Sequence, residues 1–154
     1  MVGRMAGVVE AIWICANSPG AVEPVSSARA LAERGLVGDR YLAAPDAAAD
    51  PGEALTLVEA EAIDAIAAEH GILLDPGGTR RNVVTRGVGL NDLVGREFTI
   101  GEVRCRGVEL CEPCLALQEI TGEPGLIKAL VHRGGLRADI LTDGEIAVGD
   151  AVSR

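Results

Sequence analysis

The stretch EFTIGEVRCRGVEL, from Glu97 to Leu110, contains two short runs with alternating apolar residues that meet near Gly101 and Glu102. Runs of this length, separated by a glycine, are typical of consecutive β-strands. The regular alternation of strands and helices that a doubly wound fold requires fails after residue 80. The stretch therefore favours a β-rich architecture in which strands follow one another directly.

Further strands and one clear helix precede this stretch. Val8 to Ala16 (VVEAIWICA), Ala54 to Glu59 (ALTLVE) and Arg80 to Gly87 (RRNVVTRG) predict strands. EAEAIDAIAAEHG has apolar residues on one face of a helix and ends at Gly71. The segments expected between these elements are a turn-rich connection at Glu23 to Tyr41, a mobile surface loop at Ala43 to Glu53 and a turn at Asp75 to Gly78.

The C-terminal third predicts two short helices and a hairpin. LALQEITG (115–122) and GLIKALVHRGG (125–135) each predict a helix that ends at glycine. Asp143 and Gly144 then separate two apolar runs, which is a hairpin signal. The whole pattern predicts a mixed, β-rich α/β fold. A mostly antiparallel sheet closes or half closes into a barrel, with about three short flanking helices, in a single domain over residues 1–154.

Composition excludes several classes of partner. The 154 residues carry a net charge of -9, which would repel a nucleic-acid backbone. The sequence contains no run of 18 apolar residues, so no transmembrane helix is predicted. Four scattered cysteines do not resemble the disulfide framework of a secreted protein, so a cytoplasmic location is expected.

Two of the four cysteines, Cys111 and Cys114, lie two residues apart ahead of a predicted helix. A structural zinc site would need more ligands, and the remaining candidates have no second pair spacing. A redox dithiol would be expected in a βαβ setting, which is missing here. A helix N-terminus favours a thiolate, whereas two buried thiols would simply pack as small apolar groups. These alternatives stay open from the residues alone.

Arginines gather in a few places of this acidic chain. Arg80, Arg81 and Arg86 form the densest run, HRGGLR adds His132, Arg133 and Arg137, and Gly38 to Arg40 (GDR) places another arginine in a tight turn. Guanidinium forks and glycine-exposed backbone N–H groups suit a phosphorylated ligand held near a sulfur. The alternative is that these arginines pair with surface carboxylates, and that Asp39 and Arg40 simply anchor their turn.

Several segments, in this order and spacing, resemble the MOSC domain, a family named for the C-terminal domain of molybdenum cofactor sulfurases. They are RGLVGDRY, LTLVEAEAI, PGGTRRNVVTRGVGLNDLVGREFTIGEV, ELCEPC, LVHRGGLRADIL and GEIAVGDAV. The resemblance implies a β-barrel-like α/β fold. It also implies binding of the molybdenum cofactor (molybdopterin) or a role in its sulfur chemistry, while pyridoxal phosphate binding is not expected.

The resemblance also implies roles for particular residues. Cys114 falls at the position of the thiolate ligand to molybdenum in members that reduce N-hydroxylated compounds, and is the expected catalytic residue. Arg80 and Asn82 match an arginine-x-asparagine that contacts the cofactor at a strand start. The full set of expected cofactor-binding residues is Arg40, Arg80, Arg81, Asn82, Cys111, Glu112, His132 and Arg133.

Two functions follow as expectations. The first is a molybdenum-dependent reductase of N-hydroxylated or N-oxygenated compounds, supplied by a separate electron-donor protein. The second is a non-catalytic module that carries a persulfide or the cofactor itself. A plain structural domain whose cysteines only pack is the third alternative. A complete site could require a second subunit, so a homo-oligomer is a further possibility.

Overall fold

The computed structural model describes residues 7–17, 20–113 and 115–154. Its elements, in chain order, are β1 (Gly7–Ile14), β2 (Glu23–Val25), β3 (Ser27–Leu31), β4 (Gly35–Leu36), β5 (Leu55–Glu59), α1 (Ala60–His70), β6 (Val83–Arg86), the 3₁₀ helix η1 (Leu90–Leu93), β7 (Glu97–Ile100), β8 (Val103–Leu110), α2 (Leu115–Thr121), α3 (Leu126–Leu130), β9 (Leu136–Ile140), β10 (Gly144–Ala147) and β11 (Ala151–Ser153).

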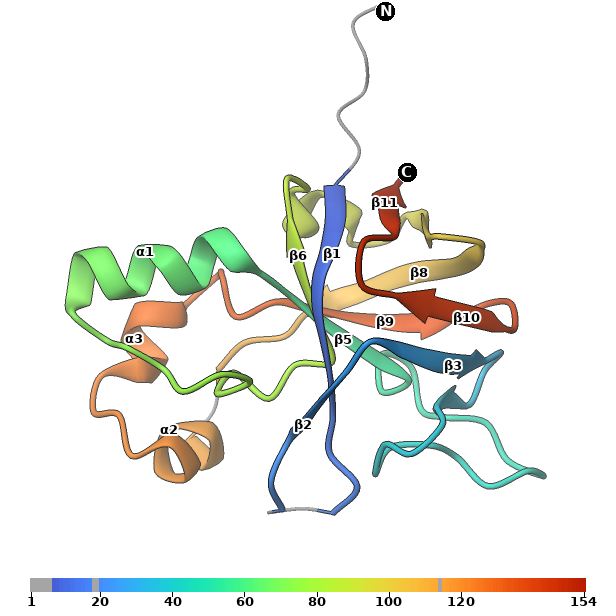
Figure 1. Ribbon diagram of the computed structural model, residues 1–154, viewed down its shortest axis with the longest axis horizontal. Helices are drawn as coiled ribbons and strands as arrows, with labels where there is room; N and C mark the ends of the chain where they lie inside the picture. Colours follow the sequence, from blue (N-terminus) through green and yellow to red (C-terminus); the bar gives the residue numbers. More distant parts are fainter. Residues whose placement is uncertain (1–6, 18–19, 114) are drawn as a thin grey trace, which may run out of the picture.

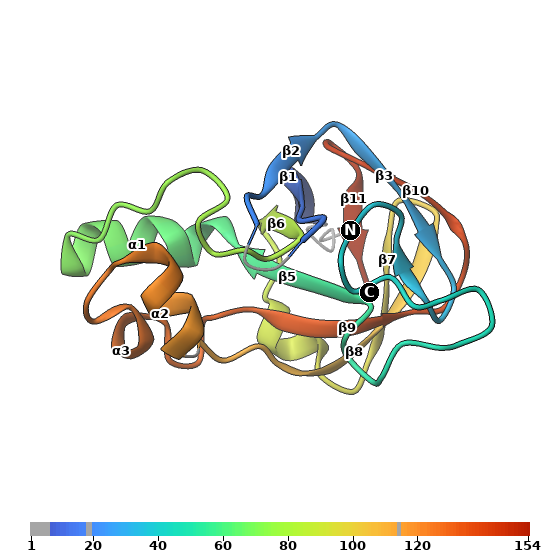
Figure 2. The ribbon, with the colours of Figure 1, turned by 90° about the horizontal axis from the view of Figure 1, so that it is seen from below.

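Strands in the described part of the chain close into a barrel (Figures 1 and 2). The order around it is β11, β7, β8, β9, β5, β6 and β1, and a β1–β11 pairing completes the ring. Neighbouring strands of this ring run antiparallel, with the exception of β5 and β6. The predicted α/β fold with a mostly antiparallel barrel is therefore confirmed, and closure leaves the ring without a free edge.

A second, three-stranded sheet corrects two predictions. The segment expected to be a turn-rich connection contains β2, β3 and β4, and the small sheet has the order β10, β3, β4. The hairpin predicted around Gly144 is wrong, because β9 pairs with β5 and β8 whereas β10 pairs with β3. The physical reason is visible at Asp143, whose carboxylate accepts the N–H of Ala32 at 2.6 Å and directs the chain to the other sheet.

The barrel interior is almost entirely aliphatic, as the composition requires. Phe98 and Cys105 are buried among valine, leucine, isoleucine and alanine side chains from the barrel strands and the small sheet. A separate apolar cluster joins the helices to the loop after α1, and comprises Ile66, Ile72, Leu117, Leu126, Ala129 and Leu130. Burial of each large aliphatic side chain stabilises the fold by about 1.5–3 kcal/mol.

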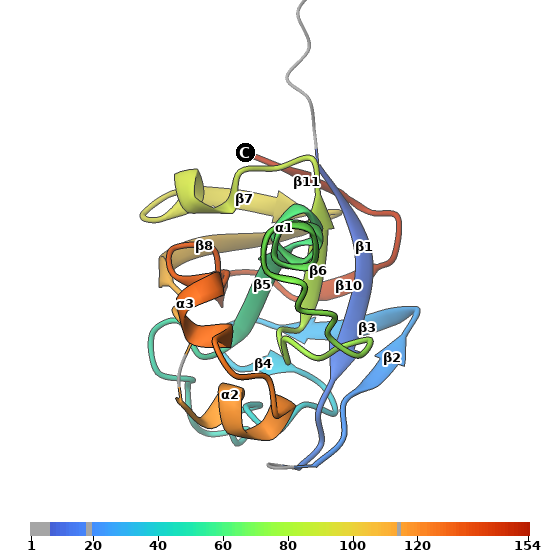
Figure 3. The same ribbon diagram turned by 90° about the vertical axis from the view of Figure 1, so that its left-hand side faces the viewer.

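The three α-helices of the described chain gather on one side of the barrel (Figures 1 and 3). α1 ends as predicted at Gly71, whose left-handed backbone lets its N–H reach the carbonyls of the last turn. α2 is likewise followed by Gly122 with a φ of 68°. The prediction that the next helix ends at a glycine is wrong, because α3 stops at Leu130 with Val131 as its C-cap. No helix in the described ranges is long and apolar enough to cross a membrane.

Candidate functional site

Five segments that are distant in sequence converge beside the helices. They are the end of β1 at Cys15, the turn after β4 at Asp39 and Arg40, the approach to β6 at Arg80–Asn82, the end of β8 at Cys111, and the start of β9 at Gly134. Hydrogen bonds join each segment to at least one of the others. Three of the six arginines that the sequence singled out, Arg40, Arg80 and Arg81, therefore lie in one region with Asp39 and Asn82.

Cys15 connects three of these segments: its own at the end of β1, the turn at Asp39 and Arg40, and the approach to β6 at Arg80. Its backbone N–H donates to Asp39 Oδ1 at 3.0 Å, and its carbonyl accepts the N–H of Arg40 at 2.8 Å. Its thiol contacts the carbonyl of Asn17 at 2.9 Å, and Arg80 Nη2 donates to Cys15 Sγ at 3.1 Å. The residue is only 2 % exposed. The buried thiol thus holds the guanidinium of Arg80, and the backbone of Cys15 fixes the turn that carries Arg40.

The two arginines around Cys15 have no carboxylate partner within the described residues. Arg80 adopts a φ of 61°, a backbone conformation that only a well-held non-glycine residue maintains, and its side-chain hydrogen bond goes to sulfur. Arg40 lies over the ring of Tyr41, 4.6 Å from its centroid, and its buried Nε has no hydrogen-bond partner among those residues. The Asp39–Arg40 pair that would anchor the turn is not formed, since Asp39 accepts from Cys15, Asn82 and Tyr41. Two cations therefore keep their charge available for an anion.

Asn82 is buried and fully engaged inside the protein. Its Nδ2 donates to the carbonyl of Trp13 and to Asp39 Oδ1, while its Oδ1 accepts from the backbone and hydroxyl of Thr56. These contacts join β1, β5 and the turn after β4 at one side chain. Asn82 thus positions the site, and its direct contact with a cofactor stays a prediction.

Arg81 ties the end of β8 to the start of β9. Its Nε donates to the carbonyl of Gly134 at 2.9 Å and its Nη2 to the carbonyl of Cys111 at 3.2 Å. Cys111 also donates its own N–H to the carbonyl of Gly135 at 2.7 Å, and it is 2 % exposed. The segment that leads from β8 toward residue 114 is consequently fixed at its first residue.

Glu112 and His132, both predicted site residues, are brought together. Glu112 Oε1 accepts the backbone N–H of His132 at 2.7 Å, and Oε2 lies 2.9 Å from the ring Nδ1. Asn91 Nδ2 donates to the carbonyl of His132, so three contacts hold this residue at a φ of 61°. Arg133, in contrast, turns away to α1, where it lies 2.7 Å from Glu69 and lowers the pKa of that carboxyl.

Cys114, the predicted metal ligand, lies outside the described residues. The helix expected after the cysteine pair is present as α2. Within the described residues no group of three or more histidine, cysteine, aspartate or glutamate side chains could hold a metal ion. The thiolate assignment of Cys114 therefore stays a prediction.

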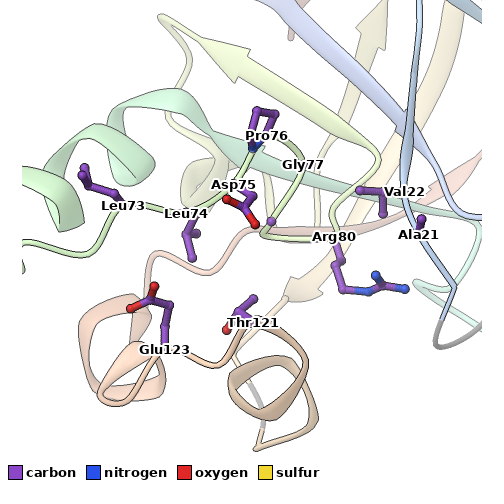
Figure 4. A pocket seen from close by; sticks show the side chains of 11 residues that line it. Ala21, Val22, Leu73, Leu74, Asp75, Pro76, Gly77, Arg80, Thr121 and Glu123 are labelled. Atoms are coloured by element: carbon purple, nitrogen blue, oxygen red, sulfur yellow. The ribbon is translucent and has the colours of Figure 1, made fainter.

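A cavity of about 290 Å³ adjoins Arg80 (Figure 4). It lies between the β1–β2 connection, the loop from residue 73 to residue 80, and the end of α2. Its lining residues are Ala21, Val22, Leu73, Leu74, Asp75, Pro76, Gly77, Gly78, Arg80, Thr121 and Glu123. Arg80 thus contacts Cys15 and also lines this cavity, whose volume is that of a small organic molecule.

Cys105 contrasts with the cysteines near the site, because its thiol is sealed in the barrel core, where burial raises its pKa to about 12. The raised pKa means that the folded state holds this proton more tightly than the unfolded chain. The stability that burial of this neutral thiol contributes is complete below the ordinary thiol pKa near 9 and is lost as pH rises toward 12.

We expect the free energy of unfolding of the wild type to fall between pH 9 and pH 12 more steeply than that of Cys105→Ala. The difference should approach 1.4 kcal/mol per pH unit, roughly, in denaturant titrations. Parallel curves for the two proteins would contradict the burial argument.

Comparisons with known proteins agree with this architecture. The family model of the MOSC domain matches residues 44–153, so the chain belongs to the MOSC domain family. This family is associated with molybdenum cofactor binding. No curated protein matches the chain by sequence.

Solved structures share the fold at low sequence identity. The YuaD protein from Bacillus subtilis has a TM-score of 0.80 and 17% identity, covering 99% of this chain and 97% of that one. YiiM from Geobacillus stearothermophilus has a TM-score of 0.71 and 16% identity, with coverages of 96% and 74%. YiiM from Escherichia coli gives 0.70 and 19%, with 97% and 69% covered.

Proposed function

We propose that this protein binds the molybdenum cofactor beside Cys15 and Arg80, with the thiolate of Cys114 as the protein ligand to molybdenum. The observation that carries the proposal is the state of the two arginines. Arg80 is held by a sulfur atom and Arg40 has a buried Nε without a partner among the described residues. A cofactor with a phosphate group and a polar pterin edge needs donors of this kind.

The chain's own residues divide the work of holding such a ligand. Arg80 and Arg40 would bind its anionic and polar groups. Asn82 and Asp39 keep Cys15 in place, and Cys15 in turn accepts hydrogen bonds from both arginines. Arg81 fixes the carbonyls of Cys111 and Gly134, and so sets the path of the chain into residue 114. A soft thiolate suits a metal that is already bound to sulfur, and nearby guanidinium groups favour the deprotonated thiol.

We infer further that the bound cofactor supports reduction of N-hydroxylated compounds. When bound, the cofactor supplies the two-electron chemistry at the substrate nitrogen–oxygen bond. Reduction of a hydroxylamine to an amine takes up two electrons and two protons and releases water. The electrons come from a separate electron-donor protein. His132 Nδ1 lies 2.9 Å from Glu112 Oε2, and Glu112 precedes the predicted ligand Cys114 by two residues, so this pair adjoins the predicted ligand segment.

A turnover assay separates a reductase from a carrier. The cofactor-loaded protein, given a chemical or protein electron donor and an N-hydroxylated base, is expected to release the corresponding amine, measured by chromatography. The matched control is Cys114→Ser, in which the proposed metal ligand is removed. Amine formation at the rate of the protein-free mixture, by a protein that retains molybdenum, would reject the reductase and favour the carrier.

A further inference from the structure

We propose that Glu112, His132 and Asn91 form a clamp that positions Cys114, and that the clamp does not bind the cofactor directly. The inference rests on the proposed function, because it gives the clamp a role toward the predicted metal ligand. The clamp itself consists of described residues, so its contacts can be tested in protein that carries no cofactor.

The chain that leads into Cys114 is short and closely packed. Only residues 111–113 separate the end of β8 from Cys114. They continue beside the chain that enters β9, and β8 and β9 are paired and run toward the helices (Figure 2). A Cβ on Gly134 would lie 2.5 Å from the carbonyl oxygen of Cys111 and 3.0 Å from Cδ of Pro113, so only glycine permits this approach. The ring of Pro113 also fixes its φ angle.

Both carboxylate oxygens of Glu112 are used to hold His132. Oε1 accepts the backbone N–H at 2.7 Å, and Oε2 lies 2.9 Å from Nδ1, which is the donor because a carboxylate only accepts. Asn91, in η1, donates from Nδ2 to the carbonyl of His132 at 2.8 Å. The clamp therefore ties the residue two positions before Cys114 to the chain ahead of β9 and to η1.

The backbone of His132 indicates that the clamp has a local function. Its φ of 61° is uncommon for a residue other than glycine and persists only where surrounding contacts maintain it. Its side chain is 76% exposed, so burial of the ring does not explain this conformation. An exposed pair of this kind contributes little to the stability of a fold. What the pair does fix is the path of residues 111–113.

Charge argues against direct contact between the clamp and the cofactor. Glu112 offers only acceptors, both of its oxygens are occupied by His132, and its negative charge opposes a phosphate group. Arg80 and Arg40 supply the donors that an anionic ligand needs. A positioning role thus replaces the cofactor contact that the resemblance implies for Glu112 and His132.

Amide hydrogen exchange tests the clamp in cofactor-free protein. Glu112→Ala removes the acceptor of the His132 N–H, so this amide should exchange roughly tenfold faster than in the wild type. Glu112→Gln keeps an acceptor oxygen at the same place and should restore most of the protection. Unchanged exchange of this amide in Glu112→Ala would overturn the proposal, because the clamp would then be absent in solution.

The rate at which loaded protein loses molybdenum during dialysis tests the positioning role. Loss should be roughly tenfold faster from Glu112→Ala and roughly threefold faster from His132→Gly, which tolerates the same φ and keeps the backbone N–H. The absorption band of the thiolate–molybdenum bond should shift in Glu112→Ala, because it depends on how the sulfur is directed at the metal. Glu69→Ala, which removes the surface carboxylate 2.7 Å from the neighbouring Arg133, should change neither.

The possible failures can be told apart. Equal loss of molybdenum from Glu112→Ala and Glu69→Ala, with an unshifted band, would disprove only this inference. Loss from Glu112→Gln as fast as from Glu112→Ala, with the His132 amide still protected, would mean that the carboxylate binds the cofactor and would also overturn it. Wild-type protein without molybdenum would reject the proposed function, and with it the role given to the clamp. If Glu112→Ala does not fold, His132→Gly against Glu69→Ala gives the same comparison.

Discussion

Replacing Cys114 by serine is expected to abolish the retention of molybdenum by protein produced in a host that makes the cofactor. A hydroxyl oxygen is a poor replacement for a soft thiolate on a metal whose other ligands include sulfur. It also stays protonated at neutral pH, whereas metal binding requires a deprotonated ligand. Molybdenum per chain, measured by mass spectrometry after gel filtration, should fall to background in Cys114→Ser.

The matched control is the other cysteine of the pair. Cys111 is buried and its backbone is fixed by Arg81 and Gly135, so serine there changes a packed side chain and removes no predicted metal ligand. Cys111→Ser should therefore retain most of the wild-type molybdenum. Equal retention by both variants would refute the ligand assignment, and loss in Cys111→Ser alone would move it to Cys111.

Replacing Arg80 by alanine is expected to weaken cofactor binding by about 10- to 100-fold, because a charge-assisted hydrogen bond to the ligand is lost. Arg80 has a sulfur atom as its acceptor and no carboxylate partner among the described residues, so its charge is free to act on a ligand. Cys15→Asp should have a similar effect by giving Arg80 an ion-pair partner. The rate of cofactor loss, followed by molybdenum content during dialysis, provides the measurement.

Arg86→Ala is the control for this change. Arg86 lies at the end of β6 and is paired with Glu10 and Asp64 on the surface, so its charge is already compensated. Its removal should leave cofactor retention unchanged, and circular dichroism should show that all variants are folded. If Arg80→Ala and Arg86→Ala retain the cofactor equally well, Arg80 has no part in binding.

Local patterns were sufficient to predict much of the fold. Runs of β-branched residues marked β1, β5, β6, β7 and β8, and helical periodicity with a terminal glycine marked α1. The short strands between Glu23 and Leu36 were missed, because two- to five-residue strands among glycine and small polar residues resemble turns. The hairpin at Gly144 was wrong because partner choice depended on Asp143 and Ala32, which are 111 residues apart.

In the candidate site, too, local motifs could be predicted from the sequence, whereas contacts between distant residues could not. The cysteine pair and the Arg80–Asn82 run are local motifs and could be recognised in the sequence. The contact between Arg80 and Cys15 spans 65 residues, and the Glu112–His132 pair spans 20, so neither partner could be assigned from spacing. Cys15 has no neighbouring cysteine or histidine at a metal-ligand spacing. Its place directly after a buried strand was the one local signal for its role. The role of Asn82 as an internal link between three elements depends on burial, which a polar residue near a strand start does not reveal.

The most direct test of the account is the molybdenum content of the wild-type protein purified from cells with active cofactor biosynthesis. The account predicts molybdenum near stoichiometric with the chain, accompanied by a pterin that is released on denaturation. Molybdenum and pterin at background, in a folded protein from cells whose other molybdenum enzymes are loaded, would contradict it.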